Sequence, residues 1–203
     1  MNKRISKLLN IFPTPVWWGI LEDHNNLNTI MKDYILGLRS SNPAGISKSN
    51  HLGWHSEDFH LNDQAPKKFL DNIKPMIKEA IDDMSWDLNS VDSKITNMWS
   101  IINKKNSSNL RHIHPNCFLS SAYYVYAPKN CGKLTFHDPR SAAVYRTVKT
   151  IENKDINSNS YNIVPQSGML VLFPSYLHHS VAVNESEDER IVISFNVDFV
   201  NKN

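Results

Sequence analysis

Residues 112–125 read HIHPNCFLSSAYYV, which places two histidines two positions apart, shortly before an apolar and aromatic run. On a β-strand successive side chains alternate between the two faces, so His112 and His114 would project to the same side. Two imidazoles held in this way can bind one metal ion if a third ligand comes from another strand. The segment therefore predicts a β-rich fold built around a metal site.

The third ligand is expected from residues 173–184, FPSYLHHSVAVN, where a turn is followed by two adjacent histidines. Because neighbouring residues of a strand point to opposite faces, only one of His178 and His179 can face the site.

A further strand is predicted over residues 190–197, RIVISFNV. Its alternation places four residues on one face: Arg190, Val192, Ser194 and Asn196. An arginine in an apolar strand is unfavourable to bury unless it meets an anion, and a carboxylate bound through two hydrogen bonds is its natural partner.

Two amphipathic helices are predicted before this β-rich part, because apolar residues recur at helical spacing over residues 27–38 and 69–84. Pro75 lies within the second segment and predicts a kink or a shorter helix. Residues 12–21, FPTPVWWGIL, are apolar with prolines at the start, as in an edge strand or a packed arm.

About eight short β-rich runs separated by turn residues follow from position 93. They read KITNMWSII, CFLSSAYYVYA, GKLTF, AAVYRTV, YNIV, MLVLF, HSVAV and RIVISFNVDFV. We therefore expect a mainly β (α+β) fold, a sandwich or barrel with N-terminal helices packed on one face. Residues 1–203 are expected to form a single domain, with 1–90 as helical support and 93–200 as the β-barrel core.

Composition excludes several classes of partner and location. Lys+Arg 22 against Asp+Glu 20 gives a net charge of +2, which offers no electrostatic case for binding nucleic acid or an anionic membrane. Two cysteines do not make a disulfide framework and favour a reducing compartment. No apolar run approaches the roughly 18 residues of a membrane span. A soluble, cytoplasmic protein is expected, in the host cytoplasm if the gene belongs to a phage.

The chain resembles a known family in seven pieces: FPTPVW, GWHS, HIHPN, SSAYYV, GKLTF through HDPR, LFPSYLHHSV and RIVISFN. These are similar to the iron(II)/2-oxoglutarate-dependent oxygenases of marine phage and bacterial genomes, distant relatives of prolyl hydroxylases. The likeness covers about residues 12–199 and is strongest over 99–196. It implies a double-stranded β-helix (a jelly-roll, cupin-like barrel), with iron(II) and 2-oxoglutarate as cofactors and dioxygen as co-reactant.

The resemblance assigns His112 as the first iron ligand. It assigns His179 as the distal ligand, because the family pattern His-x-Val fits His179 and not His178. Where relatives carry a carboxylate, this chain has His114. Either three histidines hold the metal, or Asp138 of the HDPR segment is the third ligand. A neutral third ligand would leave the iron one charge more positive and change its affinity for the cosubstrate.

The resemblance also implies that Arg190 binds the distal carboxylate of 2-oxoglutarate and that the hydroxyl of Tyr124 could donate to it. By strand alternation Ser120 and Ala122 share the face of Tyr124 and would line the cosubstrate cavity, while Tyr123 points away. No catalytic group beyond the metal centre is expected.

Pocket candidates on the neighbouring strands are Asn196, near the metal or the substrate, and the weaker Trp99, Ile101 and Asn103. The histidines at positions 24, 51, 55 and 60 are expected at the surface or behind the site, although the loop with Trp54 and His55 could cover the mouth of the barrel.

The implied reaction is hydroxylation of a protein side chain or a small metabolite, with release of succinate and carbon dioxide. Two alternatives stay open: a cupin-like metalloenzyme that does not use 2-oxoglutarate, and a non-enzymatic jelly-roll module. The sequence does not give the oligomeric state, since the apolar N-terminal arm could pack on its own barrel or on a neighbour.

Overall fold

The computed structural model describes residues 5–144 and 148–202. Its elements, in chain order, are β1 (Trp17–Ile20), α1 (His24–Ser41), β2 (Asn50–His51), β3 (Trp54–His55), α2 (Gln64–Asp83), β4 (Val91–Asn103), β5 (Ser108–His112), β6 (Leu119–Tyr126), β7 (Leu134–His137), a 3₁₀ helix (Ser141–Val144), β8 (Ser160–Ile163), β9 (Met169–Pro174), β10 (His179–Val181) and β11 (Arg190–Asn201).

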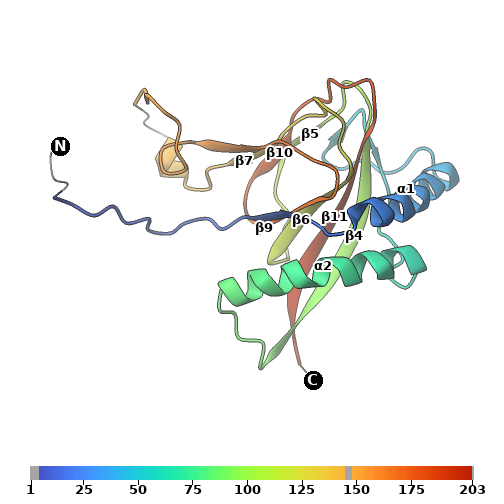
Figure 1. The fold of residues 1–203 in the computed structure, drawn as a ribbon, viewed down its shortest axis with the longest axis horizontal. Helices are drawn as coiled ribbons and strands as arrows, with labels where there is room; N and C mark the ends of the chain where they lie inside the picture. Colours follow the sequence, from blue (N-terminus) through green and yellow to red (C-terminus); the bar gives the residue numbers. More distant parts are fainter. Residues whose placement is uncertain (1–4, 145–147, 203) are drawn as a thin grey trace.

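The strands form two antiparallel sheets. The larger has the order β1-β9-β6-β11-β4-β3 and the smaller has the order β2-β5-β10-β7-β8. Both helices lie on the same side of the larger sheet, as Figure 1 shows. The other face of the larger sheet packs against the smaller sheet. The predicted β-rich core with helices on one face is therefore confirmed.

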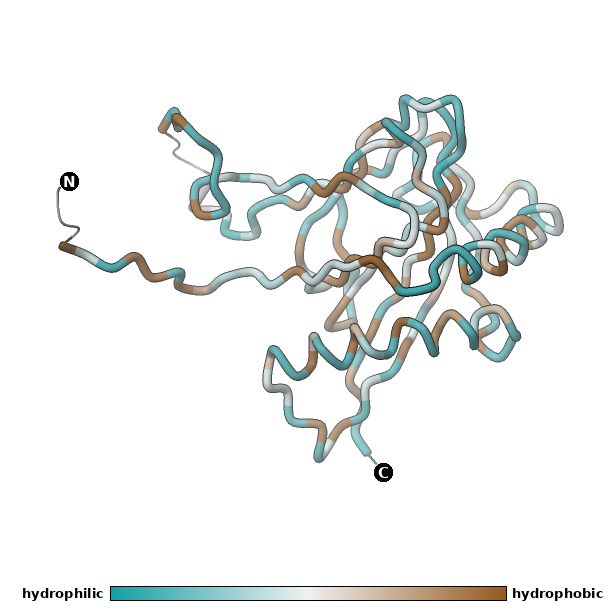
Figure 2. Tube along the Cα trace, in the orientation of Figure 1, coloured by the Kyte–Doolittle hydropathy of each residue, from teal (hydrophilic) through white to brown (hydrophobic). Residues whose placement is uncertain are grey.

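Each helix forms because its apolar residues return to one face every three or four positions. Leu27, Met31 and Ile35 of α1 are buried against the sheet, and the alternation of brown and teal along both helices is visible in Figure 2. α2 is not shortened at Pro75, which lies on its exposed side. Proline has no N–H group, so the carbonyl group four residues before it has no helical partner. On the exposed side of the helix this carbonyl group can bind water instead.

Successive side chains of β11 point alternately into two hydrophobic cores, one beneath the helices and one between the sheets, as its sequence predicts. Ile191, Ile193 and Phe195 pack toward the helices. Val192 packs in the inner core between the sheets. The strand is buried along most of its length because it lies inside the larger sheet, between β6 and β4, with the helices on one side and the smaller sheet on the other.

Two expectations about strands are wrong. Residues 142–148, AAVYRTV, were expected to form a strand, but Ser141–Val144 form a 3₁₀ helix and residues 145–147 lie outside the described residues. His112 and His114 were expected on one strand, but β5 ends at His112. The chain turns beyond it, where Pro115 cannot donate a ladder hydrogen bond and Asn116 adopts a positive φ of 63°.

The N-terminal segment contains an edge strand, one of the two alternatives expected from its sequence. β1 pairs with β9 at the edge of the larger sheet, and the residues before it extend away from the body (Figure 1).

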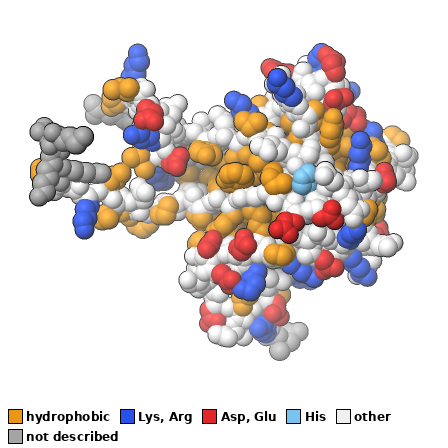
Figure 3. Space-filling model, in the orientation of Figure 1, with side chains coloured by type: hydrophobic (Ala, Val, Ile, Leu, Met, Phe, Trp, Pro, Cys, Tyr) orange, Lys and Arg blue, Asp and Glu red, His pale blue; other side chains and the backbone are white. Residues whose placement is uncertain are grey.

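Acidic and basic side chains are interspersed over the face shown in Figure 3, in line with the small net charge. Neither of the described helices has the length and hydropathy to cross a bilayer.

Candidate active site

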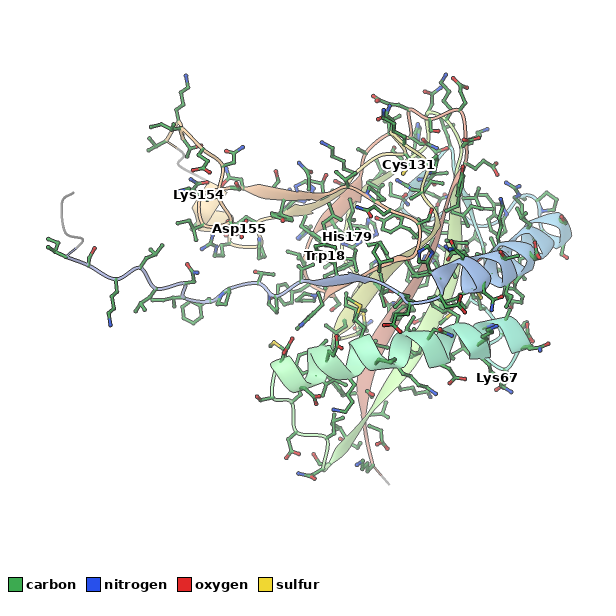
Figure 4. The ribbon with its side chains drawn as sticks, viewed as in Figure 1. Trp18, Lys67, Cys131, Lys154, Asp155 and His179 are labelled. Carbon is green, nitrogen blue, oxygen red and sulfur yellow. The ribbon has the colours of Figure 1, made fainter. Side chains whose placement is uncertain are left out.

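Three histidines from separate parts of the chain meet between the two sheets. His112 ends β5, His179 begins β10 directly opposite it, and His114 reaches the same place from the turn after β5. One ring nitrogen of each lies within 4.8 Å of the others. His179 is labelled in Figure 4, away from Lys154 and Asp155 at the far end of the connection between β7 and β8.

Hydrogen bonds fix the tautomer of the two strand histidines. Nδ1 of His112 lies 2.7 Å from the carbonyl oxygen of Leu110, and Nδ1 of His179 lies 3.0 Å from that of Leu177. Because a carbonyl oxygen can only accept, Nδ1 of each ring must carry the proton. Nε2 of each ring then keeps its lone pair for a metal ion.

His114 reaches the same state through a side chain. Its Nδ1 lies 2.8 Å from Oδ1 of Asn196, an amide oxygen that likewise only accepts. All three rings therefore present an unprotonated Nε2, which is the form of imidazole that binds metals.

Burial keeps these imidazoles uncharged. Loss of hydration lowers the pKa of His114 to about 4, and the same cause, together with the neighbouring His112, lowers the pKa of His179 to about 3. The pKa of His112 is also lowered, mainly by burial. At neutral pH no proton has to be displaced from any of the three before a metal ion binds.

The donor set fits iron(II), since three imidazole nitrogens within reach of one ion suit this metal. The carboxylate of Asp138 is engaged elsewhere. Asp138 directly follows β7, forms an ion pair of 2.8 Å with Arg140 and does not line the cavity at the histidines. Among the described residues, the cluster of possible ligands therefore contains three histidines and no carboxylate.

A cavity of about 740 Å³ adjoins the three histidines. Arg190 lines it although its side chain is only 1% exposed. One terminal nitrogen of its guanidinium donates to the carbonyl oxygens of Cys131 (2.8 Å) and Gly132 (3.3 Å), while Nε has no partner among the described residues. A buried guanidinium with a free donor beside a cavity fits a bound carboxylate, such as the distal end of 2-oxoglutarate.

Tyr124 lines the same cavity and is also 1% exposed. Burial raises its pKa to about 12, and the nearby Arg190 only partly opposes this effect. The hydroxyl therefore stays protonated at neutral pH and can donate a hydrogen bond to a carboxylate.

The remaining pocket residues divide into two groups. Ala122, Trp99, Ile101 and Asn196 line the cavity. Two others do not belong to its wall: the hydroxyl of Ser120 donates to Asn196 (3.0 Å), and the amide of Asn103 donates to Asn109 (3.0 Å). Each is turned toward a polar neighbour because a buried polar group needs a hydrogen-bond partner.

His55, expected at the surface, behind the site or in a loop over the mouth of the barrel, lies in the wall of the cavity. It is 6% exposed, lines the cavity and stacks on Trp99, with ring centroids 5.9 Å apart. Glu57 and Asp58 line the cavity as well, because the chain after β3 continues beside β4. A strand of two residues leaves no period in the sequence, so the GWHS piece of the family resemblance was the only signal.

Comparison with known proteins gives one family and many similar folds. Residues 97–196 match a family model described as "Putative 2OG-Fe(II) oxygenase". A search of curated proteins found no match in sequence.

Three of the similar solved structures illustrate the range of chemistry on this fold. A prolyl-4-hydroxylase of Pseudomonas putida has a TM-score of 0.62 at 12% identity, over 94% of both chains. A prolyl hydroxylase of Trichoplax adhaerens, in complex with a hypoxia inducible factor peptide fragment, has a TM-score of 0.63 at 12% identity, over 90% of this chain and 83% of that one. HygX of Streptomyces hygroscopicus, with nickel and 2-oxoglutarate bound, has a TM-score of 0.61 at 9% identity, over 91% and 83%. The two sheets thus form a double-stranded β-helix.

Proposed function

This chain belongs to the iron(II)- and 2-oxoglutarate-dependent oxygenases, and we propose that it hydroxylates a protein side chain or a small metabolite, releasing succinate and carbon dioxide. Its cofactors are iron(II) and 2-oxoglutarate, and its reaction takes dioxygen and a substrate. We also propose that residues 1–203 act as a single oxygenase domain, since α1 and α2 bury their apolar faces on the sheet that carries Arg190.

We assign the metal to His112, His114 and His179. The observation that carries this assignment is the shared orientation of the three rings, each with an acceptor on Nδ1 and a free Nε2. Two of these ligands are fixed on paired strands, which holds their separation before any metal binds.

Arg190 and Tyr124 would hold the distal carboxylate of 2-oxoglutarate. Both are buried, so their hydrogen bonds to an anion would not compete with bulk water. When bound, iron(II) and 2-oxoglutarate supply the activation of dioxygen and the oxidation of the substrate. The apolar wall formed by Ala122, Val192 and Phe173 would exclude water from that reaction.

The substrate is assigned to the part of the cavity beside Trp99 and His55. The likeness to prolyl hydroxylases, one of them with a bound peptide, supports a protein side chain. A HygX structure with hygromycin B bound supports a small molecule equally. A buried arginine with a free donor favours an enzyme that binds 2-oxoglutarate over a cupin-like enzyme that does not.

An anaerobic titration with iron(II), with and without 2-oxoglutarate, tests the proposal. We expect a visible metal-to-ligand charge-transfer band only when both are present, and succinate formation when dioxygen is admitted. Absence of iron binding would contradict an oxygenase. Iron binding without a 2-oxoglutarate-dependent band, unchanged in Arg190→Ala, would favour the cupin-like alternative.

A further inference from the structure

We propose that Asn196 is a positioning residue of the metal centre: its side-chain oxygen holds the ring of His114 in the tautomer and orientation that bind the metal. The inference rests on the proposed metal centre. It goes further by naming what fixes the ligand that stands where relatives have a carboxylate.

His114 differs from the other two ligands in the origin of its hydrogen bond. His112 and His179 each use the carbonyl group two residues before them, a contact within their own strand or turn. The residue two positions before His114 is His112 itself, whose carbonyl does not take this role. His114 depends instead on Asn196, which lies 82 residues later in the chain.

The backbone around His114 is fixed, but its ring is not fixed by the backbone. The amide of His114 donates to the carbonyl oxygen of Ser175 (3.1 Å), and the amide of Ser175 donates to that of Phe118 (3.0 Å). These bonds anchor the turn. They leave the rotation of the imidazole free, so another contact must set the direction of Nε2.

Asn196 is held in place from three sides. On β11 it pairs with Ser120 of β6 and with Asn97 of β4, so the sheet fixes its backbone. Its Oδ1 accepts from the hydroxyl of Ser120 (3.0 Å) as well as from His114 (2.8 Å). Only 9% of Asn196 and none of Ser120 is exposed, so the hydrogen bond between them is buried, and the one to His114 is partly buried.

The direction of these bonds decides the tautomer. With Oδ1 toward Nδ1, the proton of His114 is on Nδ1 and Nε2 is free. The reverse orientation of the amide would place NH₂ against Nδ1, which would require the proton on Nε2 and block metal binding. Aspartate at this position can only accept, so it imitates the first orientation and not the second.

Two substitutions test the proposal, with cobalt(II) as the probe in the absence of 2-oxoglutarate. Asn196→Leu keeps the branched shape of the side chain and removes the acceptor. We expect roughly 10- to 100-fold weaker cobalt binding and a changed visible spectrum, the loss typical of removing a group that orients a metal ligand. Asn196→Asp restores an acceptor, and we expect affinity and spectrum close to those of the wild type.

Asn28→Leu is the matched control. Asn28 has the same 9% exposure, and its Oδ1 accepts from the hydroxyl of Tyr123 (2.6 Å) on the helix side of the sheet. This variant should lower the melting temperature without changing cobalt affinity. If Asn196→Leu does not fold, Asn196→Ala removes the same acceptor with a smaller side chain.

The outcomes separate this inference from the proposed function. Wild-type cobalt affinity in Asn196→Leu and Asn196→Ala, or equal losses in Asn196→Asp and Asn196→Leu, would overturn the role of Asn196. If His114→Ala still abolished binding in the same series, the metal centre would stand. Failure of the wild-type protein to bind cobalt would overturn both.

Discussion

His112 and His179 lie directly opposite each other on β5 and β10, with ring centroids 4.2 Å apart. This pair places two ligands at a separation fixed by the ladder of a sheet. His114 comes from a turn, with its centroid 5.2 Å from that of His112 and 5.1 Å from that of His179. The centre therefore combines two ligands held by paired strands with a third, His114, whose ring must be oriented by a contact from elsewhere in the chain.

Removing His114 should abolish iron(II) binding, because two imidazoles alone do not hold the ion against water. Asp138→Ala should bind iron(II) like the wild type, since the carboxylate of Asp138 pairs with Arg140 and does not line the cavity. Anaerobic iron(II) titration followed by isothermal calorimetry measures both. The reverse pattern would move the third ligand to Asp138.

Replacing Arg190 by glutamine should weaken 2-oxoglutarate binding about 10- to 100-fold, the effect of losing hydrogen bonds from a charged donor. Iron affinity should change little, since Arg190 is not among the metal ligands. The charge-transfer band reports the 2-oxoglutarate affinity. Arg140→Gln is the control, because Arg140 lies at the surface beside Asp138 and should leave this affinity unchanged. Equal effects of both substitutions would argue against a carboxylate site at Arg190.

Tyr124→Phe removes one neutral hydroxyl donor and keeps the ring. A net contribution of about 0.5–1.5 kcal/mol corresponds to a roughly 2- to 10-fold loss of 2-oxoglutarate affinity. The same band measures it. An unchanged affinity would show that the hydroxyl does not reach the cosubstrate.

The metal-free protein should lose stability as the pH is lowered from about 7 to about 4. His114 and His179 have folded pKa values of about 4 and about 3, while the unfolded chain titrates near its ordinary value of about 6.5. Between these values the unfolded state binds more protons than the folded state. The free energy of unfolding therefore decreases as the pH is lowered. Melting temperatures of the metal-free protein measure the slope.

The double variant His114→Gln/His179→Gln supplies the control for that experiment. Carboxylates contribute to acid denaturation in both proteins, so the difference between the two slopes isolates the histidines. We expect a shallower slope in the double variant. Identical slopes would contradict the assignment of buried, neutral imidazoles.

Phe69→Ala should lower the free energy of unfolding by about 3–5 kcal/mol, since it would leave a cavity in the core. Phe69 is fully buried and packs on Tyr123, with ring centroids 5.0 Å apart. Phe12→Ala is the matched control: Phe12 is 87% exposed, and its loss should change stability by less than about 0.5 kcal/mol. Urea denaturation of the metal-free protein measures both.

Periodicity alone predicted the helices and the faces of β11. The stripe of Leu27, Met31 and Ile35 and the alternation around Ile193 depend only on the local geometry of the chain. Such patterns do not depend on which other helix or strand the segment packs against. The same local reading failed for AAVYRTV, where an apolar run of strand-forming residues begins as a 3₁₀ helix.

The family resemblance assigned His112, His179 and Arg190 to one site, and the structure places all three at one cavity. It contained the GWHS piece but assigned no role to His55, which lines the cavity, and it did not predict that the hydroxyl of Ser120 turns toward Asn196. Those positions follow from which strands pair, and pairing across a sheet leaves no mark in a single sequence.

The sequence by itself determined the helices, the strand faces and the set of histidines available for a metal, because these depend on residue type and local spacing. Only the tertiary structure decided how the metal centre is oriented. The contact between His114 and Asn196 joins residues 82 positions apart. The pairing of β11 with β4 and β6 sets the position of Asn196, and the hydrogen bond from the amide of His114 to Ser175 holds the turn after β5. Both depend on partners that are far away in the chain, which local spacing does not specify.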